Sequence, residues 1–336
     1  MTWLPTPHAA TDRDGVFALQ PDMAEALVEF LATADAVNDK ELLALCRLRM
    51  AQLLKCRAGL GGADPEVLAR LESWEDSAAF TAKEKAALDY TEQFMVGASD
   101  VTAEQRAELA RQLGVSEPST FVYGLYINEA FLRVLAFLDV APTADGMRWI
   151  AGRSGRGEVK ADRDFIEWVD DQESETDPVL LAAYYAFNRA TCRAHGVDEV
   201  TDEIVRLRSA EYHHCQFCQS VRRKVELPDG VQDLMAEARD YRTSTRISDR
   251  HRAALELLDV LVVAPASVDE QLRARLLEQF SPEQIVELLM KEAFWMSNKP
   301  MISLGTDPGA VSSERLTPFE YDAEGNFALM GAAAQS

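Results

Sequence analysis

Apolar residues recur three and four positions apart through most of the chain, which is the spacing of one face of an α-helix. The clearest such segments are 23–31, 42–54, 88–96, 181–187, 255–262 and 285–295. Thr102 and Ser281 are each followed by an acidic residue and a glutamine, with Pro282 directly after Ser281, and both sites predict helix N-termini. No alternating run predicts a strand convincingly. The pattern therefore predicts an all-α fold.

The two halves of the chain share a sequence pattern. An ungapped alignment of 45–56 with 204–215 matches an Arg-Leu-Arg triplet, an alanine and a terminal cysteine. Further matches follow in the same order, up to Glu129-Ala-Phe against Glu292-Ala-Phe. An ordered series of matches favours a tandem repeat, so we predict two helical domains related by internal duplication. The predicted units are a first domain at 15–142, a linker at 143–162, a second domain at 163–310 and a C-terminal tail at 311–336.

The composition of the chain indicates which binding partners and which cellular compartment to expect. The 336 residues include 56 acidic and 34 basic ones, a formal charge of −22, and 47% of them are hydrophobic. Such an acidic chain is a poor partner for nucleic acid or an anionic membrane. No apolar run approaches the roughly 20 residues of a membrane helix, and the N-terminus lacks the pattern of a secretory signal. We therefore expect a folded cytoplasmic protein, whose cysteines are kept reduced.

The second half contains one sharp chemical pattern, Glu203-x11-Cys215-x2-Cys218. Two cysteines three positions apart near a helix start can close a small disulfide loop, and a helix N-terminus lowers a thiol pKa. Only a thiolate attacks a peroxide or a disulfide, so the pair is a candidate dithiol centre. The other cysteines are expected in the core, where a free cysteine is a common small residue. These are Cys46, Cys56 and Cys192.

With this motif the chain resembles the carboxymuconolactone decarboxylase / AhpD-like (alkylhydroperoxidase D) superfamily. Redox members of that superfamily carry Glu-x11-Cys-x2-Cys-x3-His inside an all-α domain, often in tandem. The resemblance implies that Cys218 attacks a small peroxide or disulfide, that Cys215 resolves the product, and that an external thiol donor of unknown identity restores the pair. We expect no cofactor and no metal ion. Related proteins bury apolar helix faces between subunits, so a homo-oligomer is expected.

Both halves depart from the family pattern. In the first half, Ala44, Cys56 and Gly59 stand where the second half has the glutamate and the two cysteines, so we interpret this half as structural. In the second half, Arg222 stands where the family has its histidine. A guanidinium is not a base at neutral pH, but one helical turn from Cys218 it could stabilise a thiolate by its charge.

The base of the reaction is therefore open. His213 and His214 directly precede the motif, and Glu203 and Glu211 lie on the helix before it. Glu203 also has an ordinary structural interpretation, as one partner of an intrahelical ion pair. The predicted site consists of Cys215, Cys218, Glu203, His214 and Arg222.

Three alternatives remain beside the dithiol interpretation. A cofactor-free lactone-acid decarboxylase of the same superfamily needs cations and an acid or base, which Arg222, Arg206 and His214 can supply. A structural zinc site is suggested by Cys192-x2-His195, which precedes the cysteine pair at a spacing close to that of paired zinc ligands. A non-catalytic binding or scaffold role fits the degenerate first half. The decarboxylase does not need two cysteines, so the dithiol interpretation ranks first.

Overall fold

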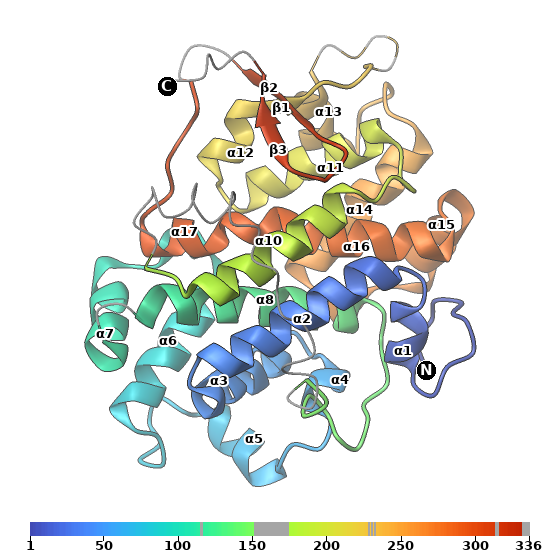
Figure 1. Cartoon of the computed structure of the whole chain (residues 1–336). Coiled ribbons are helices and arrows are strands. Elements are labelled where there is room, and N and C mark those ends of the chain that lie inside the picture. Colours follow the sequence, from blue (N-terminus) through green and yellow to red (C-terminus); the bar gives the residue numbers. More distant parts are fainter. Residues whose placement is uncertain are drawn as a thin grey trace.

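The computed structural model describes residues 1–114, 117–150, 175–227, 229, 231, 233–312 and 316–330. Helices make up most of these residues, and the described part of the chain contains three short strands (Figure 1). The predicted all-α class is therefore confirmed. None of the helices in these residues is both long and apolar enough to cross a membrane.

The first half consists of helices joined by short connections. They are α1 (Asp12–Phe17), α2 (Pro21–Val37), α3 (Lys40–Leu53), α4 (Arg57–Leu60), α5 (Pro65–Leu71), α6 (Ala82–Val96), η1 (Ala98–Asp100), α7 (Ala103–Leu113) and α8 (Glu117–Phe137). Thr102 begins α7 with a capping box, in which its hydroxyl accepts from the Gln105 amide and the Gln105 side chain accepts from the Thr102 amide. The helix start predicted at Thr102 is therefore confirmed.

The second half repeats much of this order. Its helices are α10 (Pro178–Cys192), α11 (Glu199–Tyr212), α12 (Gln216–Ser220), α13 (Leu234–Arg239), α14 (Asp249–Val263), η3 (Pro265–Ser267), α15 (Glu270–Gln279), α16 (Pro282–Trp295), η4 (Met296–Asn298) and α17 (Lys299–Leu304). Ser281 forms the capping box of α16, as its sequence predicts.

Elements of similar length occur in the same order in the two halves. The series α2, α3, α4, α6, η1, α7, α8 is matched by α10, α11, α12, α14, η3, α15, α16. Helices α3 and α11 have 14 residues each, and α6 and α14 have 15 each. A duplicated chain would have this order, and the duplication itself remains a prediction.

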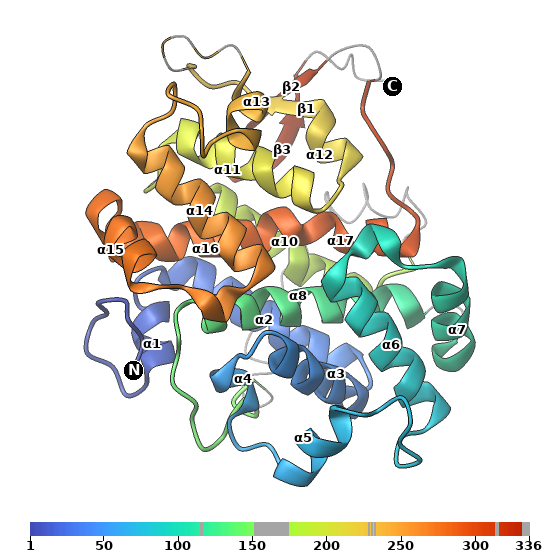
Figure 2. The same ribbon diagram turned by 180° about the vertical axis from the view of Figure 1, so that it is seen from behind.

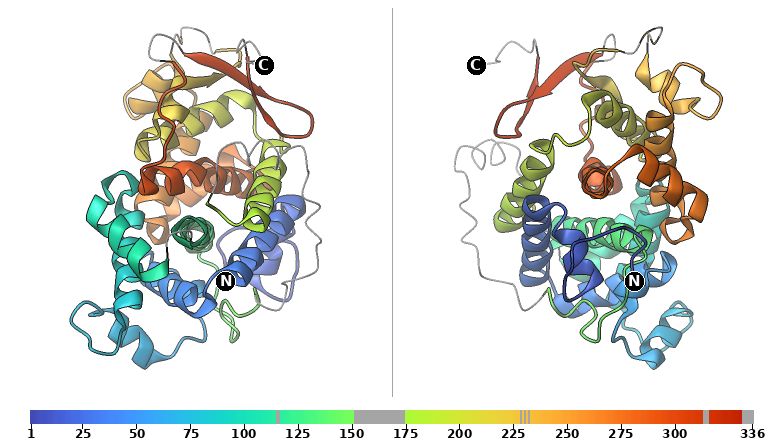
Figure 3. Two further views of the ribbon diagram at one scale, coloured as in Figure 1. Left: turned by 60° about the vertical axis from the view of Figure 1, so that its left-hand side comes forward. Right: turned by 90° about the vertical axis from the view of Figure 1, so that its right-hand side faces the viewer.

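One hydrophobic core runs through both halves. Helices α8 and α16 lie in the middle of the molecule, and the other helices surround them (Figure 3). Every residue from Ile285 to Ala293 of α16 is buried, including the charged ones, because α16 packs against α8, α10, α11 and α14. The nearly uniform apolar pattern of segment 285–295 therefore corresponds to a buried central helix.

A small sheet lies at one end of the molecule, beside α12 and α13 (Figures 1 and 2). Strand β1 (Val221–Arg223) pairs in parallel with β2 (Thr317–Tyr321), which pairs antiparallel with β3 (Phe327–Leu329). Part of the predicted tail therefore forms strands, held by the fully buried ring of Phe319. Residues 151–162 of the predicted linker and residues 313–315 and 331–336 of the predicted tail lie outside the described residues.

Candidate redox-active site

Cys215 and Cys218 form a disulfide whose Cα atoms are 5.3 Å apart. Cys215 is the N-cap residue of α12, and its sulfur accepts a hydrogen bond from the Cys218 amide at 3.1 Å. The two cysteines differ in exposure, because Cys215 is 1% exposed whereas Cys218 is only half-buried. A reagent from solvent therefore reaches Cys218 more readily than Cys215.

A tight turn places Cys215 at the start of α12. His214 adopts the left-handed backbone conformation with a φ of 52°, which is uncommon for a residue other than glycine. The Cys215 amide then donates to the carbonyl five residues earlier, Ala210, at 3.1 Å. The first half makes the same turn, with Lys55 at a φ of 53° and the amide of Cys56 bonded to the carbonyl five residues before it. The backbone that holds the cysteine motif is therefore present in both halves.

The first half has no room for a second cysteine. A Cβ atom at Gly59, the counterpart of Cys218, would lie 2.5 Å from Leu132 Cδ2 and 2.8 Å from Ala51 Cβ. Cys56 itself is fully buried, and burial raises the pKa of its thiol to about 11. The structural role predicted for this half agrees with this packing, which leaves Cys56 as an inert thiol.

Asn298 is a site residue that the sequence analysis missed. It ends η4, between α16 and α17, and its amide nitrogen donates to Sγ of Cys215 at 3.1 Å and to Sγ of Cys218 at 3.0 Å. A donor that faces a sulfur stabilises the thiolate over the thiol. No motif or spacing marks Asn298, because it lies far along the chain from the cysteines.

Replacing Asn298 with alanine is expected to raise the pKa of the Cys218 thiol. A hydrogen bond to a charged group is worth about 1.5–3 kcal/mol, so alkylation of the reduced protein by iodoacetamide should slow roughly tenfold at neutral pH. The measurement is the alkylation rate of Cys218 against pH, read by mass spectrometry. Asn38→Ala is the control, since its amide bonds backbone carbonyls of the first half. An unchanged alkylation profile in Asn298→Ala would contradict the assigned role.

Glu203 is buried in an ion pair with Arg206, which was its structural interpretation. Its oxygens lie 2.6 Å and 2.7 Å from the guanidinium, and one of them also accepts from the Arg223 amide at 3.1 Å. Arg206 in turn donates to the carbonyls of Cys218 at 3.0 Å and Val221 at 2.9 Å. Glu203 therefore holds an arginine that fixes the backbone after the cysteine pair, and both of its oxygens are engaged.

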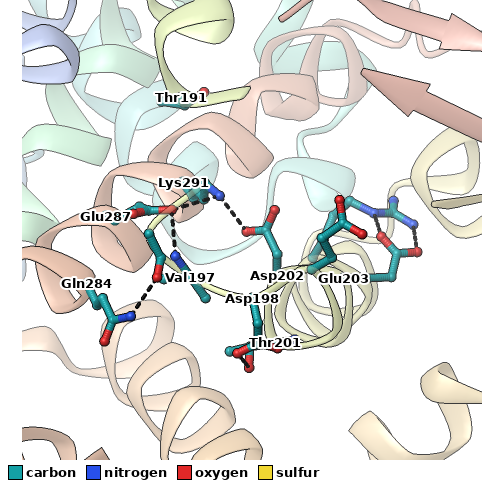
Figure 4. A network of polar contacts seen from close by, with 12 residues as sticks. Thr191, Val197, Asp198, Thr201, Asp202, Glu203, Gln284, Glu287 and Lys291 are labelled. Carbon is teal, nitrogen blue, oxygen red and sulfur yellow. Dashed lines mark hydrogen bonds and ion pairs between the residues drawn. The ribbon is translucent and has the colours of Figure 1, made fainter. Parts of the chain in front are cut away.

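A second buried network lies beside this pair on α11 and joins it to α16 (Figure 4). Lys291 of α16 lies 3.0 Å from carboxylate oxygens of both Asp202 and Glu287. Asp202 also pairs with Arg223 of β1 at 2.9 Å, and Glu287 accepts from the Val197 amide at 3.2 Å. This network fixes α11 and β1 against the central helix.

Arg222 does not occupy the position expected for it. Helix α12 ends at Ser220, and Arg222 lies on β1 because the chain becomes extended at Val221 to pair with β2. Its guanidinium donates to the carbonyls of Gln219 at 2.7 Å and Val221 at 2.8 Å. The predicted helical placement one turn from the cysteine is therefore wrong, and these contacts do not support a role in stabilising its thiolate.

The candidate bases occupy different environments. His214 is exposed, and Glu211 pairs with Arg239 at 2.5 Å. His213 points inward instead, where its Nε2 lies 3.5 Å from an oxygen of Glu292 and has no hydrogen-bond partner among the described residues. Burial holds the pKa of His213 well below its ordinary value, so this imidazole is neutral at neutral pH.

The geometry gives little support to the zinc and decarboxylase alternatives. No three His, Cys, Asp or Glu side chains of the described residues are placed to hold a metal ion, so Cys192 and His195 do not form such a group with the cysteine pair. Of the cations suggested for a carboxylate, Arg206 is paired with Glu203. The free cysteines are buried, as predicted for core residues. These are Cys46, Cys56 and Cys192.

Fold and site define a helical protein with a disulfide-forming Cys-x2-Cys pair where α11 meets α12. The chain is 31% identical over 225 residues to the uncharacterized proteins Rv2313c and MT2376 of two Mycobacterium tuberculosis strains, H37Rv and CDC 1551. The match covers 66% of this chain and 73% of each relative, so the chain belongs to the family of these mycobacterial proteins. The uncharacterized protein YnjA of Escherichia coli is 34% identical over 125 residues, which are 37% of this chain and 57% of YnjA. No family model and no solved structure matches the chain.

Proposed function

We propose that the protein is an oxidoreductase that reduces a small peroxide or disulfide with the Cys215–Cys218 dithiol. The observation that carries the proposal is a disulfide between one buried and one half-buried cysteine, whose sulfurs both receive a hydrogen bond from Asn298. Reactivity of a thiol depends on its access to the substrate, so the more exposed Cys218 suits the nucleophilic role and Cys215 the resolving one. The resemblance of the motif to the AhpD-like superfamily supports the same assignment.

In this scheme the Cys218 thiolate attacks an oxygen of the peroxide. The O–O bond breaks, the leaving oxygen takes a proton and departs as an alcohol or water, and Cys218 becomes a sulfenic acid. Cys215 then attacks the sulfenic sulfur, so that the S–S bond forms and the hydroxyl leaves as water with the proton of the Cys215 thiol. An external thiol donor returns two electrons and two protons to the pair.

The remaining expectations fit this scheme. The matching order of helices supports a duplicated chain in which the second half alone carries the dithiol. A cytoplasmic location would supply the reducing thiols that the cycle needs. A homo-oligomer, expected from the resemblance, is compatible with chemistry that lies within one chain.

A thiol count tests the proposal. Thiols are counted after unfolding in denaturant. The reduced protein should show five, and protein that was treated with peroxide while folded should show three. Cys56→Ala provides the matched control, because it removes a buried thiol from the turn of the first half and should still lose two. A count that stays at five after peroxide, in protein that remains folded by circular dichroism, would overturn the proposal.

A further inference from the structure

A cluster of ionisable side chains lies in the interior where the two halves meet. It combines Glu129 and Arg133 of α8, Glu292 of α16, Lys299 of α17 and His213 at the C-terminal end of α11. All are buried or nearly so, and both glutamates are 0% exposed. Buried charges are costly unless they are paired, so the contacts within the cluster decide which groups are charged.

The first glutamate of the cluster is permanently paired. Glu129 lies 2.6 Å from the Lys299 ammonium and 2.7 Å from the Arg133 guanidinium. Two cations therefore face one carboxylate, which leaves one positive charge in excess when Lys299 is protonated. Burial lowers the pKa of Lys299 to about 8, so this cation is retained at neutral pH.

The second glutamate has no such pairing. Ser209 donates to Glu292 Oε1 at 2.9 Å, whereas Oε2 has no hydrogen-bond partner among the described residues. His213 Nε2 lies 3.5 Å from Oε1 and is likewise without a hydrogen bond in the described part of the chain. Burial raises the pKa of Glu292 well above its ordinary value, which favours the protonated form of its carboxyl.

The charge balance allows this proton to leave. If Glu292 ionises, two carboxylates face two cations and the cluster becomes neutral, whereas with Glu292 protonated the cluster carries a single positive charge. The other titratable groups that face Glu292 do not alter this balance, because Tyr126 of α8 donates its hydroxyl to a backbone carbonyl and His214 is exposed. The cluster therefore accommodates both protonation states of Glu292.

The two glutamates occupy matching positions in the predicted repeat, Glu129-Ala-Phe and Glu292-Ala-Phe. Only the half with the dithiol leaves its glutamate without a cation bonded to it. The cluster also adjoins the cysteines along the chain, since His213 is two residues before Cys215. Asn298, which bonds both sulfurs, directly precedes Lys299.

We propose that Glu292, acting through His213, supplies the proton that the buried Cys215 sulfur needs when the disulfide is reduced. The thiolate of a reducing dithiol attacks the more accessible Cys218 sulfur, a bond forms between these two sulfurs, and the Cys215–Cys218 bond breaks. The electron pair stays on Cys215, which takes the proton released by Glu292. A second thiolate of the reductant then frees Cys218, and solvent returns a proton to Glu292. Protonation of the leaving sulfur while the S–S bond breaks speeds its departure. The effect is largest in a buried site, where a thiolate charge is costly.

The test is the rate at which dithiothreitol reduces the disulfide, measured against pH. Glu292→Gln keeps the acceptor for Ser209 but removes the proton, and it should slow reduction at least roughly tenfold at neutral pH, since general acid catalysis is worth about 10²- to 10⁴-fold. The pH profile should also lose one ionisation. His213→Asn should slow reduction in the same way, which gives a second reading if one variant folds poorly.

Glu287→Gln is the matched control. Glu287 is a buried glutamate on the same helix, but it is paired with Lys291 in the separate network of Figure 4. Its replacement can destabilise the fold, and it should leave the pH profile of reduction unchanged. Glu292→Gln and His213→Asn proteins that are reduced at the wild-type rate with a wild-type profile would overturn the inference.

The role in turnover rests on the proposed function, but the two can fail separately. Reduction by dithiothreitol needs only the disulfide, so a protein that consumes no peroxide can still show the loss in Glu292→Gln. Conversely, the wild-type protein can lose two thiols to peroxide while the Glu292→Gln disulfide is reduced at the wild-type rate. That result would support the proposed function and contradict the role of Glu292 as the proton donor.

Discussion

Replacing Cys218 with serine is expected to lower turnover of a peroxide or disulfide substrate by roughly 10³-fold or more, which is the scale on which loss of a nucleophile is felt. Cys218 is the more exposed of the two cysteines, and a serine hydroxyl at its position is not ionised at neutral pH. The measurement is the rate of peroxide consumption with a thiol reductant in excess. Undiminished turnover in Cys218→Ser would rule out the dithiol mechanism.

Two further variants separate the roles of the sulfurs. In Cys215→Ser, Cys218 should still react once with peroxide, and its sulfenic acid should be trapped by dimedone because no resolving thiol is present. Cys192→Ser is the control for cysteine replacement, since Cys192 is buried and burial raises the pKa of its thiol to about 12. It should retain wild-type turnover. Sulfenic acid found on Cys215 instead of Cys218 would reverse the assigned order.

Replacing Glu203 with alanine is expected to lower the free energy of unfolding by about 3–5 kcal/mol, the usual cost of leaving one partner of a buried ion pair without the other. Arg206 would then be buried with an uncompensated charge, and its hydrogen bonds to the carbonyls of Cys218 and Val221 would weaken. The measurement is urea unfolding followed by circular dichroism. Activity should fall as well, because the position of Cys218 depends on Arg206.

A control on the same helix distinguishes burial from charge. Glu199 is largely exposed and pairs with Arg223 at 3.0 Å, so Glu199→Ala should cost less than about 1 kcal/mol. The double variant Glu203→Ala/Arg206→Met should recover much of the stability lost in Glu203→Ala, since it removes both charges together. An equal loss of unfolding free energy in Glu199→Ala and Glu203→Ala would show that the buried ion pair contributes no more to stability than the exposed one.

The helices were predictable because their signals are local. The apolar period of 285–295 and the capping sequences at Thr102 and Ser281 lie within the segments that they describe. The sheet was not predictable, since β1 has only three residues and finds its partner β2 near the far end of the chain. A strand this short carries no recognisable alternation, and its pairing depends on where α12 stops.

The features of the site also divide into those that local sequence predicts and those that it does not. The Cys215–Cys218 pair follows from a local spacing, and the ion pair of Glu203 follows from helical geometry. Asn298 reaches the cysteine pair, and Glu292 reaches Ser209 of α11, from distant segments of the chain, so only the packed structure shows these contacts. A position four residues after Cys218 predicts one helical turn of separation, but pairing of β1 with β2 extends the chain there and places Arg222 on the strand.

The packing around Gly59 decides how readily the first half could acquire a cysteine pair by mutation. Leu132 and Ala51 occupy the space that a side chain at position 59 would need. A mutation of Gly59 to cysteine would therefore meet a steric clash before it offered any chemical benefit, and a smaller residue at Leu132 would have to arise with it. A cysteine pair is thus hard to introduce into this half by single substitutions, and the dithiol chemistry that we propose stays confined to the second half.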